Sequence, residues 1–198
     1  MNWLMSLAAF FARLLPAPVK RLLYRIPVFS DNLRKVLNRA APIGMSQVVV
    51  AAGELEGFSL LLDLQSEKDY WLGTYELGLQ EALRELVKPG MTAYDVGANI
   101  GYISLMLARL VGETGRVYAF EALPANTERW KTNVELNRLS DRMQLFNGAV
   151  SNSSSPVQFL VHNSGGMGKV LGSAGRENTY QNKIEVTGIT LDEFVFNL

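Results

Sequence analysis

The sequence predicts an α/β fold, in which a mostly parallel sheet carries helices on both faces. Beyond residue 93, strand-like and helix-like segments alternate, as they do in βαβ units. The first of these strands runs into a glycine-spaced turn, Asp95-Val-Gly97-Ala-Asn99-Ile-Gly101, and the second ends in Glu121. Open parallel sheets bind ligands beyond the carboxyl ends of their strands. Two acids at neighbouring strand ends therefore predict a binding site at that edge.

Residues 1–40 are predicted to form a basic amphipathic helical segment, separate from a domain at residues 41–198. Apolar residues recur at helical spacing until Pro16 and Pro18 interrupt them. The segment contains seven Lys or Arg and one Asp, a net charge of +6, and the rest of the chain carries −6. The apolar run is shorter than the ~20 residues of a membrane span and lacks the charged start of a signal peptide. Two interpretations stay open: a helix lying on an anionic membrane, or a helix packed on the domain or on a second subunit.

A β-hairpin and a helix are expected next. Apolar residues 47–52 and 58–64 flank the glycine-bounded turn 53–57, which is the pattern of a hairpin. Leucines at helical spacing over residues 77–87 predict a helix that ends before Pro89 and Gly90.

The turn after the first core strand is typical of a nucleotide-type cofactor loop. It connects that strand to a predicted helix at residues 103–111, and glycines there let the backbone approach a ligand closely. A dinucleotide loop needs the pattern G-x-G-x-x-G, and the third glycine is missing here. The carboxylate of Asp95 would repel a pyrophosphate but would attract an ammonium and a sulfonium group. The spacing therefore favours S-adenosylmethionine.

The second core strand, residues 116–120, ends in Glu121, 20 residues beyond Gly101. A carboxylate at this position can accept hydrogen bonds from both hydroxyls of a ribose. The alternative is that Glu121 caps the helix that starts near Pro124, a common first-turn residue.

The remaining elements follow from the same patterns. We expect a helix at 125–138, strands at 143–149, 156–161 and 183–187, and a helix starting at Thr190. The glycine-rich stretches 163–168 and 172–178 lack a strand-to-helix context and predict a surface loop rather than a phosphate site.

Composition limits the chemistry. The 198 residues are 48% hydrophobic, which suits one core with an appendage, and 19 basic residues balance 19 acidic ones, so we expect no nucleic-acid partner. The absence of cysteine excludes disulfides and thiolate sites, and the single histidine, His162, excludes multi-histidine metal sites and a serine–histidine triad confined to this chain. A lone histidine on a short strand is most often structural. We expect a cytoplasmic protein, with peripheral membrane contact as the alternative offered by residues 1–40.

Several motifs resemble the FkbM family of S-adenosylmethionine-dependent methyltransferases over residues 47–198. They are VKPGM at 87–91, YDVGANIG at 94–101, FEALP at 120–124, GTYE at 73–76, NVELN at 133–137 and FNGAVS at 146–151. The resemblance implies a class I, Rossmann-like methyltransferase that methylates a hydroxyl of a small molecule or glycan, such as a sugar, a lipid or a secondary metabolite.

The resemblance also implies roles at the cofactor. Asp95 and Asn99 would hold the methionyl part, Glu121 the ribose hydroxyls, and Ala149 would border the adenine. Glu76 would meet the amino or ribose end, although an acid at a helix start is also favoured by the helix dipole. The full set of expected cofactor contacts is Glu76, Asp95, Gly97, Ala98, Asn99, Gly101, Glu121 and Ala149.

The sequence departs from the family in one respect. FkbM-type proteins continue with a strand of the type Ile-Lys-Ile-Asp-Val-Glu-Gly, and no such segment occurs before Leu198. We therefore expect a fragmentary chain whose incomplete sheet exposes an edge and an apolar face, with no assignable catalytic base. The alternatives are a non-catalytic remnant that binds cofactor or membrane, and a nicotinamide-dependent enzyme, which the missing third glycine disfavours.

Overall fold

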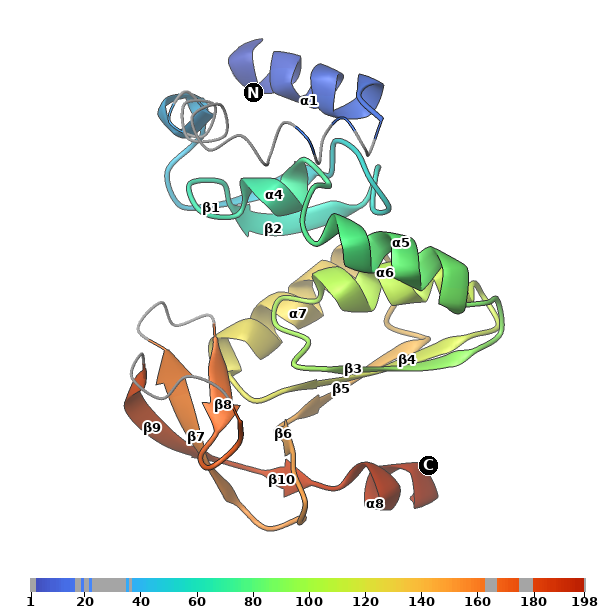
Figure 1. Cartoon of the computed structure of the whole chain (residues 1–198), viewed down its shortest axis with the longest axis vertical. Helices are drawn as coiled ribbons and strands as arrows, with labels where there is room; N and C mark the ends of the chain where they lie inside the picture. Colours follow the sequence, from blue (N-terminus) through green and yellow to red (C-terminus); the bar gives the residue numbers. More distant parts are fainter. Residues whose placement is uncertain are drawn as a thin grey trace. The chain divides into compact units, whose positions relative to one another are not determined.

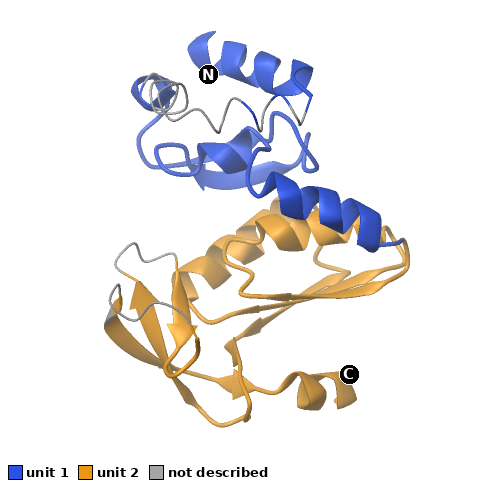
Figure 2. Cartoon of the chain, in the orientation of Figure 1, with its two compact units in different colours: residues 1–88 blue, residues 89–198 orange. Residues whose placement is uncertain are grey.

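The computed structural model describes residues 3–16, 19, 22, 35, 37–162, 167–174 and 180–197. The chain divides into two units, residues 1–88 and residues 89–198 (Figure 1, Figure 2). The division expected between residues 40 and 41 falls inside the first unit. It stays a prediction, because much of residues 1–40 lies outside the described ranges.

The first unit combines helices with a hairpin. The elements bounded within its described residues are α1 (Trp3–Leu14), β1 (Met45–Val49), β2 (Ser59–Asp63), α4 (Lys68–Trp71) and α5 (Leu77–Leu86). The antiparallel pairing of β1 with β2 confirms the predicted hairpin, and α1 ends two residues before Pro16, as its helix-breaking ring requires. Arg13 on α1 donates from Nε to the Ala51 carbonyl at 2.8 Å. Among the described residues, no helix is long and apolar enough to cross a membrane.

The second unit is built on a parallel sheet. Its strands β3 (Thr92–Val96), β4 (Arg116–Glu121) and β5 (Met143–Asn147) pair in the order β3-β4-β5. The helices α6 (Tyr102–Val111) and α7 (Pro124–Leu136) lie on one face, and α8 (Leu191–Phe196) lies on the other (Figure 1). The predicted α/β class, with helices on both faces of a parallel sheet, is confirmed.

The helix α8 changes one expectation about the sheet. Phe194 packs edge-on against the rings of Phe120, Tyr118 and Phe146, with centroids 4.8, 5.5 and 6.3 Å apart. The Thr190 hydroxyl caps this helix by accepting a hydrogen bond from the Glu193 amide at 3.1 Å. The apolar face is therefore partly covered, although Val96 beside it is exposed.

A second, antiparallel sheet stands beyond the parallel strands. It has the order β8-β7-β9, and its strands lie along the chain between β6 and β10, which form a short parallel pair. The bounds are β6 (Ala149–Val150), β7 (Val157–His162), β8 (Gly168–Val170), β9 (Tyr180–Val186) and β10 (Gly188–Ile189).

Two predictions for this region need correction. The expected strand 143–149 is interrupted at Gly148, where a Cβ would collide with the Thr187 carbonyl oxygen. Gly168, expected in a loop, begins β8, because its missing side chain lets that strand pass the ring of Phe159. Of the two glycine-rich stretches, residues 163–166 and 175–178 lie outside the described ranges.

Candidate cofactor site

A cavity of about 400 Å³ opens at the carboxyl ends of β3, β4 and β5. Its volume falls in the usual range for small-molecule sites, ~300–1,000 Å³. It is lined by Val96, Gly97, Asn99, Phe120, Glu121, Ala122, Gly148, Ala149, Val150, Phe159, Met167, Gly168, Val170 and Tyr180. The cavity therefore lies where open α/β sheets bind ligands, with the antiparallel sheet as its second wall.

The loop from β3 to α6 has positive φ at every second residue. The φ values are +85° at Gly97, +50° at Asn99 and +92° at Gly101. Glycine adopts this region without strain, and Asn is among the side chains that tolerate it best. This explains why Asn can stand where a dinucleotide loop would have a further glycine.

The two outer glycines meet different surroundings. A Cβ on Gly97 would find no protein atom within 4 Å, and this residue lines the cavity. A Cβ on Gly101 would lie 2.9 Å from Cδ1 of Trp130 on α7. Gly97 therefore leaves room on the ligand side, whereas Gly101 is needed for packing between the loop and α7.

The carboxylate of Glu121 connects the cavity to its supporting loop. Oε2 accepts a hydrogen bond from the Asn99 amide and Oε1 accepts one from the Leu123 amide, both at 2.8 Å. Asn126 donates to Oε1 from Nδ2 at 3.4 Å, so Glu121 also supports the start of α7. Each carboxylate oxygen has two lone pairs. Among the described residues Asn99 uses one on Oε2, which leaves one for a ligand hydroxyl.

Asp95 faces the other way. Its carboxylate accepts a hydrogen bond from the Ser104 hydroxyl on α6 at 2.5 Å, and Ser104 in turn accepts one from Nε1 of Trp130 at 2.9 Å. Burial raises the pKa of Asp95, and the hydrogen bond from Ser104 opposes that rise. Asp95 does not line the cavity, so its predicted contact with the methionyl part stays a prediction.

The loop is also fixed from α7. Nδ2 of the fully buried Asn133 donates to the Ile100 carbonyl at 2.8 Å, and the Ala98 amide donates to the Phe120 carbonyl at 3.0 Å. These bonds hold the loop in place before any ligand arrives. Sequence reasoning missed Asn133 as a loop support, although the residue lies in the NVELN motif.

The structure brings together half of the expected contacts. Gly97, Asn99, Glu121 and Ala149 line the cavity, while Asp95, Ala98 and Gly101 lie behind it. Glu76 lies in the first unit, just before α5 and with φ of +49°, and its contact with the cofactor stays a prediction.

The second wall of the cavity was not expected from the sequence. Phe159, Met167, Val170 and Tyr180 come from the antiparallel sheet and its connections. Phe159 packs in a cluster with Ala122, Leu123 and Ala149, which fixes this sheet against the end of β4 and the start of β6. An acidic edge at Glu121 facing an apolar wall suits a ligand with sugar hydroxyls and a flat, weakly polar base. Among the described residues, no cluster of three His, Cys, Asp or Glu could hold a metal ion.

Comparison with known proteins agrees with this site. Residues 95–198, just over half of the chain, match the family described as "Methyltransferase FkbM domain". A protein-L-isoaspartate O-methyltransferase of Aeropyrum pernix is 35% identical over 98 residues, which are 50% of this chain and 29% of that protein. A ribosomal protein L11 methyltransferase of Pelotomaculum thermopropionicum is 30% identical over 150 residues, which are 72% of this chain and 48% of that protein.

Among solved structures, a SAM-dependent O-methyltransferase of Thermotoga maritima is 25% identical. The similarity covers 40% of this chain and 27% of that one, with a TM-score of 0.32. The chain thus spans less than half the length of these relatives. The family match bears out S-adenosylmethionine as the cofactor. On this match, together with the loop and the strand-end carboxylate, the chain belongs to the methyltransferase FkbM domain family.

Proposed function

We propose that this chain binds S-adenosylmethionine in the strand-end cavity and forms part of an enzyme that methylates a hydroxyl oxygen. The acceptor we propose is a sugar, a lipid or a secondary metabolite. The observation that carries the proposal is the carboxylate of Glu121, which lines the cavity and is held by the amide of the cofactor loop itself. Glu121 would thus both bind the ribose and hold the loop that approaches the ribose.

The residues divide among three parts of the cofactor, the ribose, the adenine and the methionyl part. Glu121 would accept a ribose hydroxyl at Oε2, and the open side of Gly97 would admit the ligand to the backbone. Ala149 and Phe159 would flank the adenine, since both line the cavity and pack in one cluster. Asn99 would face the methionyl part. When bound, the cofactor supplies an electrophilic methyl group on a sulfonium.

The rate of transfer would come largely from positioning. Holding an acceptor oxygen in line with the methyl group can contribute ~7–11 kcal/mol in well-oriented systems. Removal of the hydroxyl proton needs a base within hydrogen-bond reach, and none of the described residues is assigned that role. An oxygen acceptor is supported by the A. pernix relative, whose name states O-methyl transfer.

Isothermal titration calorimetry tests the binding half of the proposal. The chain should bind S-adenosylmethionine and S-adenosylhomocysteine and should not bind NAD. Binding of NAD alone would support the nicotinamide alternative, and a folded chain that binds none of the three would contradict the site.

Transfer is measured separately, with radiolabelled methyl and a panel of sugar, lipid, protein and RNA acceptors. Methylation of a sugar or lipid hydroxyl supports the proposed acceptor, whereas methylation of protein or RNA replaces it. Binding without transfer to any acceptor would favour a non-catalytic role. The cytoplasmic location stays a prediction.

A further inference from the structure

Helix α1 has two unlike faces. Met5, Ala9 and Ala12 are buried and face the rest of the first unit. The opposite face consists of large apolar side chains that are 44–71% exposed: Trp3, Leu7, Phe10, Phe11 and Leu14. Their spacing of three and four residues places them along one side of the helix. Packing within the first unit therefore buries the small-residue face of α1 and leaves the large apolar face exposed.

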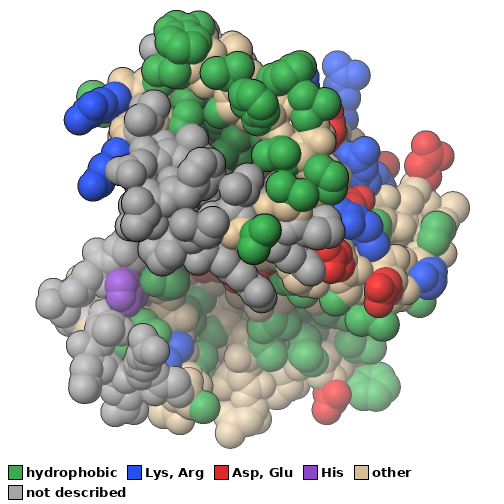
Figure 3. Space-filling model, turned by 45° about the horizontal axis from the view of Figure 1, so that its top comes forward, with side chains coloured by type: hydrophobic (Ala, Val, Ile, Leu, Met, Phe, Trp, Pro, Cys, Tyr) green, Lys and Arg blue, Asp and Glu red, His purple; other side chains and the backbone are tan. Residues whose placement is uncertain are grey.

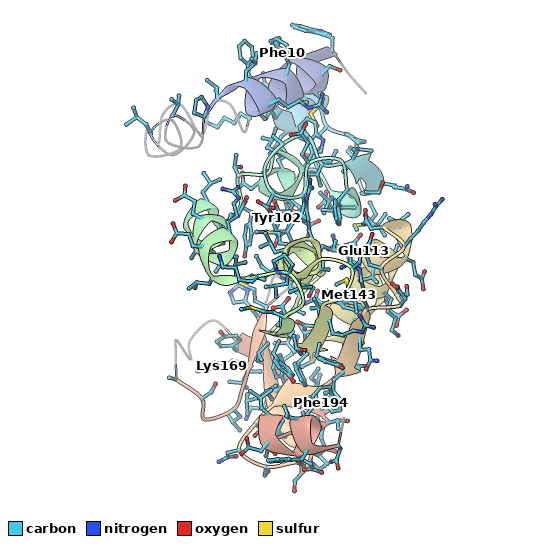
Figure 4. The ribbon with its side chains drawn as sticks, turned by 90° about the vertical axis from the view of Figure 1, so that its right-hand side faces the viewer. Phe10, Tyr102, Glu113, Met143, Lys169 and Phe194 are labelled. Atoms are coloured by element: carbon cyan, nitrogen blue, oxygen red, sulfur yellow. The ribbon has the colours of Figure 1, made fainter. Side chains whose placement is uncertain are left out.

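The exposed face is continuous. Hydrophobic side chains gather over α1 in the space-filling view (Figure 3), and Phe10 points away from the ribbon (Figure 4). Scattered apolar residues on a surface need no explanation, but a contiguous patch usually marks an interaction site. Trp and Phe on one side of a helix are typical of helices that lie in the boundary layer of a bilayer.

Charge indicates which partner this face would meet. The 40-residue segment that contains α1 carries seven basic residues and one acid, a net +6, within a chain of zero net charge. Anionic lipid headgroups attract such a segment, with each basic residue near the surface contributing ~1 kcal/mol. Two copies meeting through this segment would bring +6 against +6, which opposes self-association. Apolar area combined with positive charge therefore fits an anionic membrane better than a second copy.

We propose that α1 docks this protein on an anionic membrane surface, with its apolar outer face inserted and the net positive charge of residues 1–40 supplying the attraction to the headgroups. The proposal is independent of the cofactor site, because it rests on the first unit alone.

Tryptophan fluorescence of the whole chain gives a direct test. The chain has three tryptophans, and Trp71 and Trp130 are already buried, so a change on membrane binding reports on Trp3. Vesicles of phosphatidylcholine with phosphatidylserine should shift the emission to the blue and should sediment the protein. Vesicles of phosphatidylcholine alone should do so more weakly, and 1 M salt should reduce the difference because it screens surface charge to ~3 Å.

A matched pair of variants separates the contribution of the outer face of α1 from the effect of placing a new carboxylate elsewhere on the protein. Phe10→Glu should weaken partitioning at least about tenfold, a loss equivalent to ~1.4 kcal/mol. Leu86→Glu makes the same kind of change on α5, at a residue as exposed as Trp3, and should bind as the wild type does.

Three results would overturn the proposal. The first is an equal loss in both variants, and the second is binding that ignores lipid charge and salt. The third is a blue shift that appears without vesicles as protein concentration rises, since it would assign the face to a second copy of the chain.

Discussion

Replacing Glu121 by Gln should weaken cofactor binding and should cost the fold a comparable free energy, which the assays below measure separately. The side chain is only 6% exposed, and its two oxygens accept the amides of Asn99 and Leu123 at 2.8 Å. Gln keeps one acceptor oxygen and turns a donor toward the other amide. Leaving one buried donor unpaired costs about 1–3 kcal/mol of folding free energy.

The loss in affinity follows from charge. Hydrogen bonds to a carboxylate, such as the one expected from a ribose hydroxyl at Oε2, contribute about 1.5–3 kcal/mol each. Their loss should raise the dissociation constant for S-adenosylmethionine about 10- to 150-fold. Calorimetry with S-adenosylmethionine and S-adenosylhomocysteine measures the affinity, and thermal unfolding followed by circular dichroism measures the fold.

Two further variants make the result interpretable. Glu128→Gln makes the identical change on the exposed side of α7, where Glu128 pairs with Lys131, and should leave binding unchanged. Glu121→Asp keeps the charge but withdraws it by one methylene, so its affinity should be intermediate. An affinity of Glu121→Gln within about threefold of the wild type, in a folded protein, would refute the ribose role of this carboxylate.

Three other predictions concern the loop and the sheet. The pKa of Asp95 is raised mainly by burial, so ionisation is disfavoured in the folded state. Between the unfolded pKa of Asp95, about 3.9, and its higher folded pKa, the wild type should lose stability as pH rises, relative to Asp95→Asn. If the free energies of unfolding of the two proteins changed in parallel from pH 4 to 8, this prediction would be contradicted. Gly101→Ala combines positive φ with a close contact and should cost about 2–4 kcal/mol of folding free energy. Gly97→Ala should cost only about 1–2 kcal/mol of folding free energy, yet it should impair cofactor affinity at least as strongly as Gly101→Ala does. Equal urea midpoints for these two variants would be inconsistent with the packing described. Phe194→Ala should cost about 1–3 kcal/mol through lost aromatic packing, whereas Phe196→Ala, on the exposed side of the same helix, should change the urea midpoint little; equal effects would argue against the packing of α8 on the sheet.

The cofactor loop could be predicted from sequence because its determinants are local. Gly97, Asn99 and Gly101 each tolerate positive φ, and a strand before them and a helix after them fix the geometry within about 15 residues. Glu121 was predictable for the same reason, since its place at the end of β4 follows from the strand pattern alone.

The side-chain direction of Asp95 follows from the period of its strand. Side chains alternate along a strand, so Asp95 and Val96 must point to opposite faces. Asp95 lies on the face that α6 covers, where Ser104 meets it, and not at the cavity. The two-residue period thus accounts for the support that Asp95 gives to α6, and its predicted contact with the methionyl part stays a prediction.

The second wall of the cavity could not be predicted, because it depends on pairing between distant segments. Phe159 of β7 pairs with both Val170 and Ile184, and nothing local to any of these strands specifies the partner. Gly168 illustrates the difficulty, since glycine in a polar stretch is typical of a loop until a crowding ring on the next strand is known. The packing of Phe194 on the parallel sheet could not be predicted for the same reason, because it joins segments that are far apart in the sequence.

Amide chemical shifts in a titration with S-adenosylhomocysteine test the central claim most directly, because they place the ligand on the chain without any substitution. The largest changes should occur at the amides of Gly97, Asn99, Glu121 and Ala149, with Phe159 and Val170 following. The amides of α1 and β1 should not move. Changes centred away from the strand ends, or none at saturating ligand in a folded protein, would contradict the account.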